Sequence, residues 1–122
     1  MKYLCLIYLD EQKMAALPAA EMNALNARHL DLNDALRASG HFIEAEALEP
    51  AAQGAYLRVR HGKPAVTDGP FTEAKELVAG FYLIEARDMS EAIRIAARFP
   101  SAPLGTVEVR PTRQLVVEGR SP

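Results

Sequence analysis

Two long apolar runs, residues 3–9 and 77–86, restrict the fold more than any other feature of this sequence. A strand with one face in water alternates apolar and polar residues, whereas an unbroken apolar run is typical of a strand covered on both faces. The first run is also too short to cross a bilayer, and no small-residue cleavage site follows it. We therefore expect two buried strands that need shelter from water on both sides.

A long helix is predicted between the two runs. Pro18 suits the first turn of this helix and Gly40 its C-terminal cap. Its inward stripe, at steps of three and four, is expected to comprise Met22, Leu25, His29, Leu32 and Leu36. Polar residues on its other sides are expected to be Asn23, Asn26, Asn33 and Arg37. The segments before and after the helix, residues 10–17 and 41–50, are expected to be connectors without regular structure.

The remaining elements are two further strands, a short helix and a last strand. Residues 55–60 alternate and predict a strand, which a turn at 61–63 joins to a short strand at 64–67. Asp88-x-x-Glu91 is a capping pattern that opens a second helix, and Pro100 ends it. Its inward stripe is expected to comprise Met89, Ala92, Ile93, Ala96 and Ala97. The alternating residues 106–111 predict the last strand.

This order of elements predicts a ferredoxin-like α+β fold made of two βαβ-type halves. Right-handed crossovers place both helices on one face of an antiparallel sheet. The two apolar strands then present apolar side chains on the opposite face, and a large open apolar face is rarely left in water. A second copy stacked on this face would cover it, so the sequence predicts a homodimer through the sheet face.

Size and charge bound the class of protein. The 122 residues are enough for one domain, expected at 1–117, with a loose tail at 118–122. The net charge of −2 and the scattered basic residues disfavour nucleic-acid binding. With the single cysteine, Cys5, no internal disulfide can form, and we expect a cytoplasmic protein without membrane association. The three histidines lack the spacing of metal ligands, so neither a metal nor another cofactor is expected.

The stretch from Val66 to Glu85, which contains Asp-Gly-Pro-Phe-x-Glu-x-Lys-Glu, resembles the DGPF branch of the YCII-related family. Residues 1–8, 47–50 and 106–111 also resemble segments of that family. The resemblance implies a ferredoxin-like domain assembled as a dimeric α+β barrel. This wider group includes isomerases, dehalogenating lyases and monooxygenases, many without a cofactor. Relatives of the DGPF branch are also often encoded beside extracytoplasmic-function sigma factors.

The resemblance implies a His–Asp active site. The histidine of the family's His-Leu pair matches His29, and its acidic partner would be Asp68 or Asp10. Two roles are open for His29: a general acid or base, or a histidine at the edge of the core that either bonds to a backbone carbonyl or extends to solvent. Asp68 has a plain alternative as well, because Asp often begins a turn.

Ligand binding is assigned to polar residues of the strands. Arg58, Arg60 and Arg110 share one parity on their strands and would form an anion-binding surface if that side lines a cleft. The alternative is that they lie in water or pair with Glu108. Tyr8 would offer a hydroxyl, and Glu73 is a further candidate, although a solvated charge run is its default.

These residues favour a cofactor-independent lyase or isomerase acting on a small anionic organic molecule. His29 would move a proton, and Asp68 or Asp10 would orient the ring. A non-catalytic ligand-binding or regulatory module, for which the resemblance suggests a sigma-factor pathway, is the alternative. A scaffold without any ligand is a third.

Overall fold

The structure is a computed structural model that describes residues 1–70 and 73–120. Its strands, in chain order, are β1 (Lys2–Leu9), β2 (Phe42–Ala47), β3 (Ala55–Arg60), β4 (Lys63–Asp68), β5 (Leu77–Glu85) and β6 (Thr106–Pro111). Its helices are α1 (Glu11–Ala15), α2 (Ala19–Ala38), α3 (Met89–Ala96) and the single 3-10 turns η1 (Ala51–Gln53) and η2 (Ala102–Leu104).

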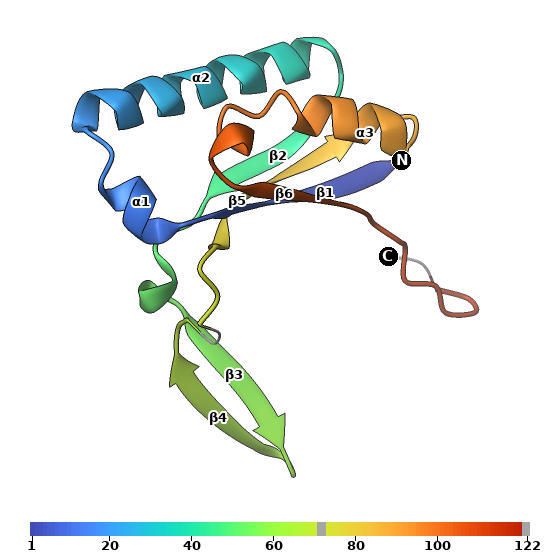
Figure 1. Ribbon diagram of the computed structural model, residues 1–122. Coiled ribbons are helices and arrows are strands. Elements are labelled where there is room, and N and C mark those ends of the chain that lie inside the picture. Colours follow the sequence, from blue (N-terminus) through green and yellow to red (C-terminus); the bar gives the residue numbers. More distant parts are fainter. Residues whose placement is uncertain (71–72, 121–122) are drawn as a thin grey trace.

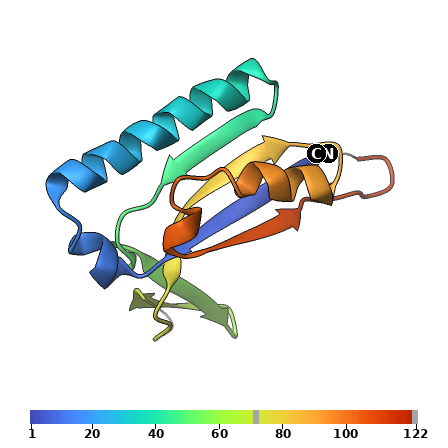
Figure 2. The ribbon, with the colours of Figure 1, turned by 45° about the horizontal axis from the view of Figure 1, so that its top comes forward.

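The main sheet has the strand order β2-β5-β1-β6, and each neighbouring pair is antiparallel. Helices α2 and α3 lie side by side over one face of this sheet, as Figures 1 and 2 show. Each helix connects two strands that point the same way and have one antiparallel strand between them. This arrangement confirms the predicted ferredoxin-like α+β fold.

The core lies between the sheet and the two helices. In β1 every second residue is buried, and the same holds for most of β5, because successive side chains of a strand point to opposite faces. The predicted stripe of α2 faces these strands, with Leu25, Leu32 and Leu36 buried and His29 half-buried. The fully buried side chains of largest volume are those of Phe99, Leu36, Ile84 and Cys5.

The other face of the main sheet carries a strip of apolar side chains. Leu4 and Leu6 of β1 lie opposite Leu83 and Phe81 of β5, so these four residues share one face. We call this surface the open face, because in the described part of the chain no helix covers it (Figure 1). The strip is flanked by Glu44 and Glu46 on β2 and by Glu108 and Arg110 on β6.

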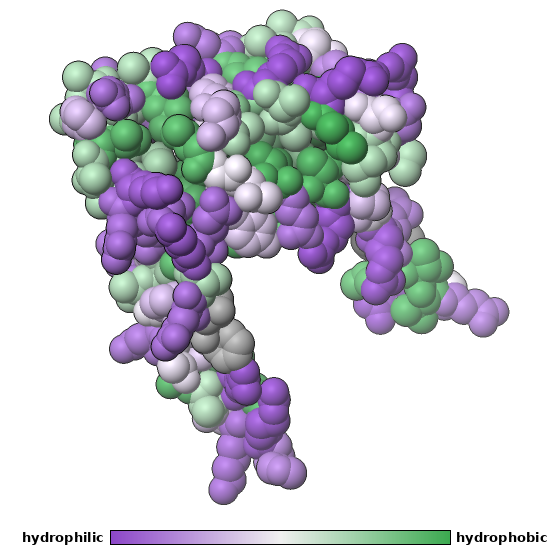
Figure 3. Space-filling model, viewed as in Figure 1, coloured by the Kyte–Doolittle hydropathy of each residue, from purple (hydrophilic) through white to green (hydrophobic). Residues whose placement is uncertain are grey.

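The strands predicted at 55–60 and 64–67 are present, but their expected place in the main sheet was wrong. The strand that completes the first half is β2, which was expected within a connector, and it pairs with β5 at the sheet edge. β3 and β4 pair with each other in a separate two-stranded sheet and project away from the body (Figures 1 and 3). The sequence of β2 is weak in strand formers, since four of its six residues are Glu or Ala.

Two helical details also differ from the expectation. Residues 11–15 form α1 instead of a connector, because the Asp10 carboxylate caps this turn by accepting the backbone N–H groups of Gln12 and Lys13. In α3 the buried face is rotated about the helix axis relative to the predicted stripe. Ile95 is buried with Ala92 and Ala96, whereas Ile93 is exposed. Both positions carry isoleucine, but only Ile95 lies four residues before the buried Phe99 and so packs on the same side.

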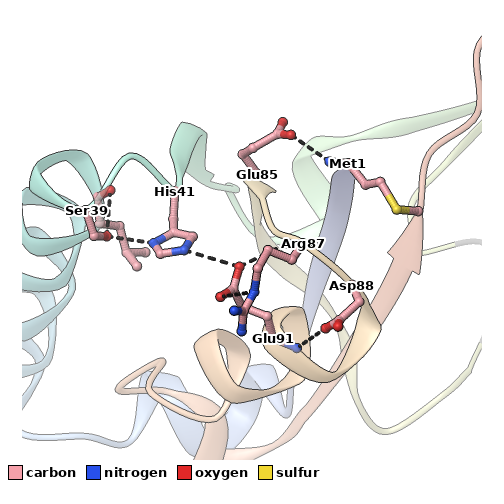
Figure 4. A network of polar contacts seen from close by, with 8 residues as sticks. Met1, Ser39, His41, Glu85, Arg87, Asp88 and Glu91 are labelled. Carbon is pink, nitrogen blue, oxygen red and sulfur yellow. Dashed lines mark hydrogen bonds and ion pairs between the residues drawn. The ribbon is translucent and has the colours of Figure 1, made fainter.

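The capping pattern of α3 is confirmed and gives a stability prediction. The Asp88 carboxylate accepts the Glu91 backbone N–H at 2.9 Å, and the Glu91 carboxylate accepts the Arg87 backbone N–H at 2.9 Å (Figure 4). Asp88→Ala is expected to lower the free energy of unfolding by about 1 kcal/mol, measured by urea denaturation. Asp88→Asn keeps the acceptor and should stay close to wild type. Equal stability of the two variants would contradict the capping role.

Candidate functional site

A hollow of about 560 Å³ lies at one end of the open face. Its floor is formed by Tyr8 of β1 and Val78 of β5, and its walls include Leu48, Tyr56 and Glu76. The hollow therefore forms where the sheet, the segment around η1 and the base of the β3–β4 hairpin meet. Apolar side chains dominate its surface, and a few polar groups converge on it, which is the usual composition of a small-molecule site.

The Asp-Gly-Pro turn supports the wall of this hollow. The Gly69 backbone N–H donates to the carbonyl oxygen of Gly54 at 3.1 Å, and a Cβ at Gly69 would overlap the carbonyl oxygen of Ala51. Only glycine allows this close approach to η1. The other side of η1 is held by Glu11, whose carboxylate accepts the Ala51 backbone N–H at 2.9 Å. The position of the wall thus depends on the turn and on α1.

Tyr8 belongs to a charged hydrogen-bond chain on the open face. Its hydroxyl donates to the Glu108 carboxylate at 3.0 Å, and Arg110 forms an ion pair with the other oxygen of Glu108. The hydrogen bond to Glu108 is the main cause that raises the pKa of Tyr8, with smaller effects of burial and of the negative charge. The hydrogen bonds from Tyr8 and Arg110 lower the pKa of Glu108. At neutral pH this chain therefore consists of a phenol, a carboxylate and a guanidinium.

His29 lies on the helix side of the main sheet, within a network of uncharged groups. Its Nδ1 is 2.8 Å from the Tyr82 hydroxyl, and its Nε2 is 3.0 Å from the Ser101 hydroxyl. The Tyr82 hydroxyl donates to the Asn33 side-chain oxygen at 2.7 Å. Ser101 is only 3% exposed, so this side of the ring faces the interior.

The proton positions in this network follow from the donors. Because the single Tyr82 hydroxyl proton goes to Asn33, His29 Nδ1 must donate to the Tyr82 oxygen. Nε2 then carries the lone pair and accepts from Ser101. Burial and, to a smaller degree, the positive charge of Arg28 lower the pKa of His29, which agrees with a neutral ring. Burial also raises the pKa of Tyr82 to about 12. Both ring nitrogens are satisfied without a carboxylate.

The structure does not join His29 to either predicted acidic partner. Asp10 caps α1, and Asp68 is exposed at the end of β4, opposite Ala55. Among residues 1–70 and 73–120, no carboxylate forms a hydrogen bond or an ion pair with His29. The His–Asp pair therefore stays a prediction.

The predicted ligand-binding residues divide into two groups. Tyr8 lines the hollow, and Arg110 is linked to Tyr8 because both bind the Glu108 carboxylate. Pairing with Glu108 was the alternative role considered for this arginine. Arg58 and Arg60 lie on the projecting strand β3, and Glu73 is exposed beyond the hairpin. These three do not line the hollow. The neighbouring Phe71 and Thr72 lie outside the described residues.

The sequence missed both hydrogen-bond partners of His29, Tyr82 and Ser101, and also Asn33, which bonds to Tyr82. Asn33 was expected on another side of α2, and neither Tyr82 nor Ser101 was predicted to lie beside the ring. The spacing of four residues from His29 to Asn33 was a usable signal, because such residues are neighbours on a helix surface. Ser101 and Tyr82 meet the ring only through the tertiary packing of distant segments.

A second polar cluster joins α2 to α3 at the far end of the domain (Figure 4). The His41 ring lies between two polar groups: its Nδ1 is 2.7 Å from the Ser39 hydroxyl, and its Nε2 is 3.4 Å from the Glu91 carboxylate. Arg87 forms an ion pair with the same carboxylate at 3.1 Å. The Arg87 backbone N–H is the main cause that lowers the pKa of Glu91. These groups line a hollow of about 360 Å³, where Ser39 is the C-cap residue of α2 and Glu91 lies in the first turn of α3.

Comparison with known proteins places this domain in a family. Residues 1–116 match the model of the YCII-related domain. The chain belongs to the YCII-related family. The YCII-related chain is also 34% identical over 119 residues to an uncharacterised protein of Rhizobium meliloti (strain 1021), a match that covers 91% of each chain. This relative carries no functional description that could be transferred.

In the described part of this YCII-related chain, none of the helices has the length and apolar character needed to cross a membrane. Nor do residues 1–70 and 73–120 contain a group of three or more His, Cys, Asp or Glu side chains placed to hold a metal ion.

Proposed function

We propose that this YCII-related domain works as a homodimer that binds a small organic molecule in the hollow beside Tyr8. The observation that carries this proposal is the position of the hollow at the end of an apolar sheet face that no described helix covers. A second copy stacked on that face would bury the apolar strip and enclose the hollow. The chain's membership of the DGPF branch remains a prediction from residues 66–85.

The lining of the hollow indicates the charge of the ligand. Its charged side chains are two carboxylates, those of Glu49 and Glu76, and the described lining contains no basic residue. An uncharged or cationic molecule fits this lining better than an anion, because like charges repel in a partly desolvated site. An anionic ligand was predicted from Arg58, Arg60 and Arg110, none of which lines the hollow. An anion would bind there only if these arginines approached the hollow from outside its present lining.

Tyr8 is the group in the hollow best placed to act on a ligand. Its phenol stays protonated at neutral pH, and its single hydroxyl proton goes to Glu108. The phenol oxygen can therefore accept a hydrogen bond from a ligand, and it donates a hydrogen bond or a proton to a ligand oxygen only when the bond to Glu108 breaks. A cofactor-independent lyase or isomerase reaction is the chemistry that such a group supports. Catalysis by His29 with Asp68 or Asp10 remains a separate proposal, and it requires one of the present hydrogen bonds of His29 to break.

The test is a thermal-shift screen with uncharged, cationic and anionic metabolites, followed by mass spectrometry of each hit. Tyr8→Phe is expected to weaken binding of a hit about tenfold, because it removes one hydrogen bond to the ligand. Tyr3→Phe removes a phenol from the buried helix side of the same strand and serves as the matched control.

The outcomes separate the alternatives. A product in the mass spectrum indicates an enzyme, and stabilisation without a product indicates a ligand-binding module. Hits that bind equally well to Tyr8→Phe and wild type, or a library without hits, would contradict a ligand site at Tyr8. A preference for anionic hits would contradict the charge assigned to the ligand.

A further inference from the structure

We infer that the β3–β4 hairpin is an arm whose apolar face packs on a second copy of this chain. The inference rests on the proposed homodimer and adds to it a part of the interface that lies outside the main sheet. It is carried by the two-faced sequence of the hairpin, its exposure and the area that a stable dimer requires.

The two faces of the hairpin differ sharply in polarity. The turn at His61 and Gly62, both with positive φ, fixes the register, in which Leu57 lies opposite Val66. Opposed residues share a face, so one face carries only apolar side chains between its ends, namely Leu57, Val59, Pro64 and Val66. The other face includes the basic residues Arg58, Arg60 and Lys63.

The apolar face is in water in the single chain. Leu57, Val59 and Val66 are 63%, 54% and 68% exposed, and every residue of β3 and β4 is exposed. A two-stranded hairpin without a covered face is marginally stable in water. The alternation of apolar and polar residues in β3 is the pattern of a strand with one covered face, yet the described part of the chain provides no cover.

The hairpin projects on the side of the open face, away from α2 and α3 (Figures 1 and 3). The C-terminal segment projects on the same side and also exposes apolar residues, Leu115, Val116 and Val117. The open face therefore lies between two projecting apolar segments. A copy seated on the open face would meet both of them.

The area of the open face favours such an arm. Four strands about 4.8 Å apart, with six to nine residues and a mean length of about 24 Å, cover a flat area of about 460 Å² before the relief of their side chains is counted. A stable interface buries about 800 Å² on each partner, so the open face alone falls short of that area. The apolar face of the hairpin extends the surface that a second copy would cover. For this reason we assign the arm to a second copy rather than to another protein.

Two adjacent substitutions test the arm. Val66→Glu places a charge on the apolar face, and Ala65→Glu places the same charge on the opposite face of the same strand. We expect Val66→Glu to raise the dissociation constant of the dimer at least tenfold, and Ala65→Glu to change it less than threefold. Sedimentation equilibrium gives both constants, and circular dichroism checks that both variants fold, since the hairpin lies outside the core.

The outcomes distinguish the arm from the dimer itself. A wild-type chain that is monomeric at tens of micromolar would overturn the homodimer and the arm together. A wild-type dimer that both substitutions leave unchanged, or weaken equally, would overturn the arm alone. Val66-dependent binding to phosphatidylglycerol vesicles, with an unchanged dimer, would assign the apolar face to a membrane and also overturn the inference.

Discussion

His29→Ala is expected to lower the free energy of unfolding by about 2–4 kcal/mol. The substitution removes the partner of two hydroxyl groups, those of Tyr82 and Ser101, in a region where water has little access. It also leaves a void between α2 and β5. Urea denaturation at pH 7.5 measures the loss, with Leu30→Ala as the control, because the neighbouring Leu30 is 64% exposed. Equal stability of the two variants would contradict a packed, fully bonded ring.

The same network predicts a pH dependence. The pKa of His29 is lowered in the folded domain, so below the ordinary value of 6.5 the unfolded chain binds more protons at this position than the folded chain does. The stability contributed by the neutral His29 ring is therefore complete above pH 6.5, and it is lost as the pH falls through the lowered pKa of the folded state. The stability difference between wild type and His29→Gln should therefore shrink between pH 7.5 and pH 5. A constant difference would contradict a neutral, half-buried ring.

This stability role changes how a catalytic test of His29 must be designed. Loss of turnover in His29→Ala would not separate a lost proton carrier from a loosened core. His29→Gln keeps a polar side chain of similar length, so turnover should be compared on this variant at a temperature where it is fully folded. Retained turnover would leave Tyr8 as the group for proton transfer, whereas a loss without a change in stability would favour the His29 mechanism.

The fold was predictable where the sequence pattern reports burial directly. β1 and β5 are central strands, and their unbroken apolar runs supply both the core side chains under the helices and the apolar strip of the open face. β2 lies at the edge, and its Glu44 and Glu46 face away from the helices, so its pattern is weak. β3 has a strong strand pattern although it lies outside the main sheet. Its alternation is explained if its apolar face is covered by another chain.

The site was less predictable, because its residues meet only through tertiary structure. Tyr8 and Glu108 are 100 positions apart and come together because β1 and β6 are neighbours in the sheet. The His29 ring met hydroxyl groups from β5 and from the segment after α3 instead of a carboxylate. In contrast, Gly80 is a local signal, because a glycine inside an apolar strand often marks a bulge or a close backbone approach. It lies beside a register shift, and a Cβ there would be 2.9 Å from the Glu46 carbonyl oxygen.

Leu6→Glu is expected to dissociate the proposed dimer, raising its dissociation constant at least 100-fold. Leu6 lies on the central strand of the open face, opposite Phe81, so a carboxylate there would be buried without a partner in the dimer. Leaving one uncompensated charge in such an interface costs about 3–5 kcal/mol, which corresponds to a factor of about 100 or more. Analytical ultracentrifugation over a range of micromolar concentrations measures the change.

Leu30→Glu is the matched control, because it makes the same substitution on the outer side of α2, where the side chain is already exposed. This variant should dimerise like wild type. Leu6→Glu adds a carboxylate beside Glu108 in the single chain as well, so circular dichroism must show that the monomer is folded. A folded Leu6→Glu variant that still dimerises like Leu30→Glu would show that the copies meet elsewhere. The ligand hollow would then need an enclosing wall other than the partner's sheet.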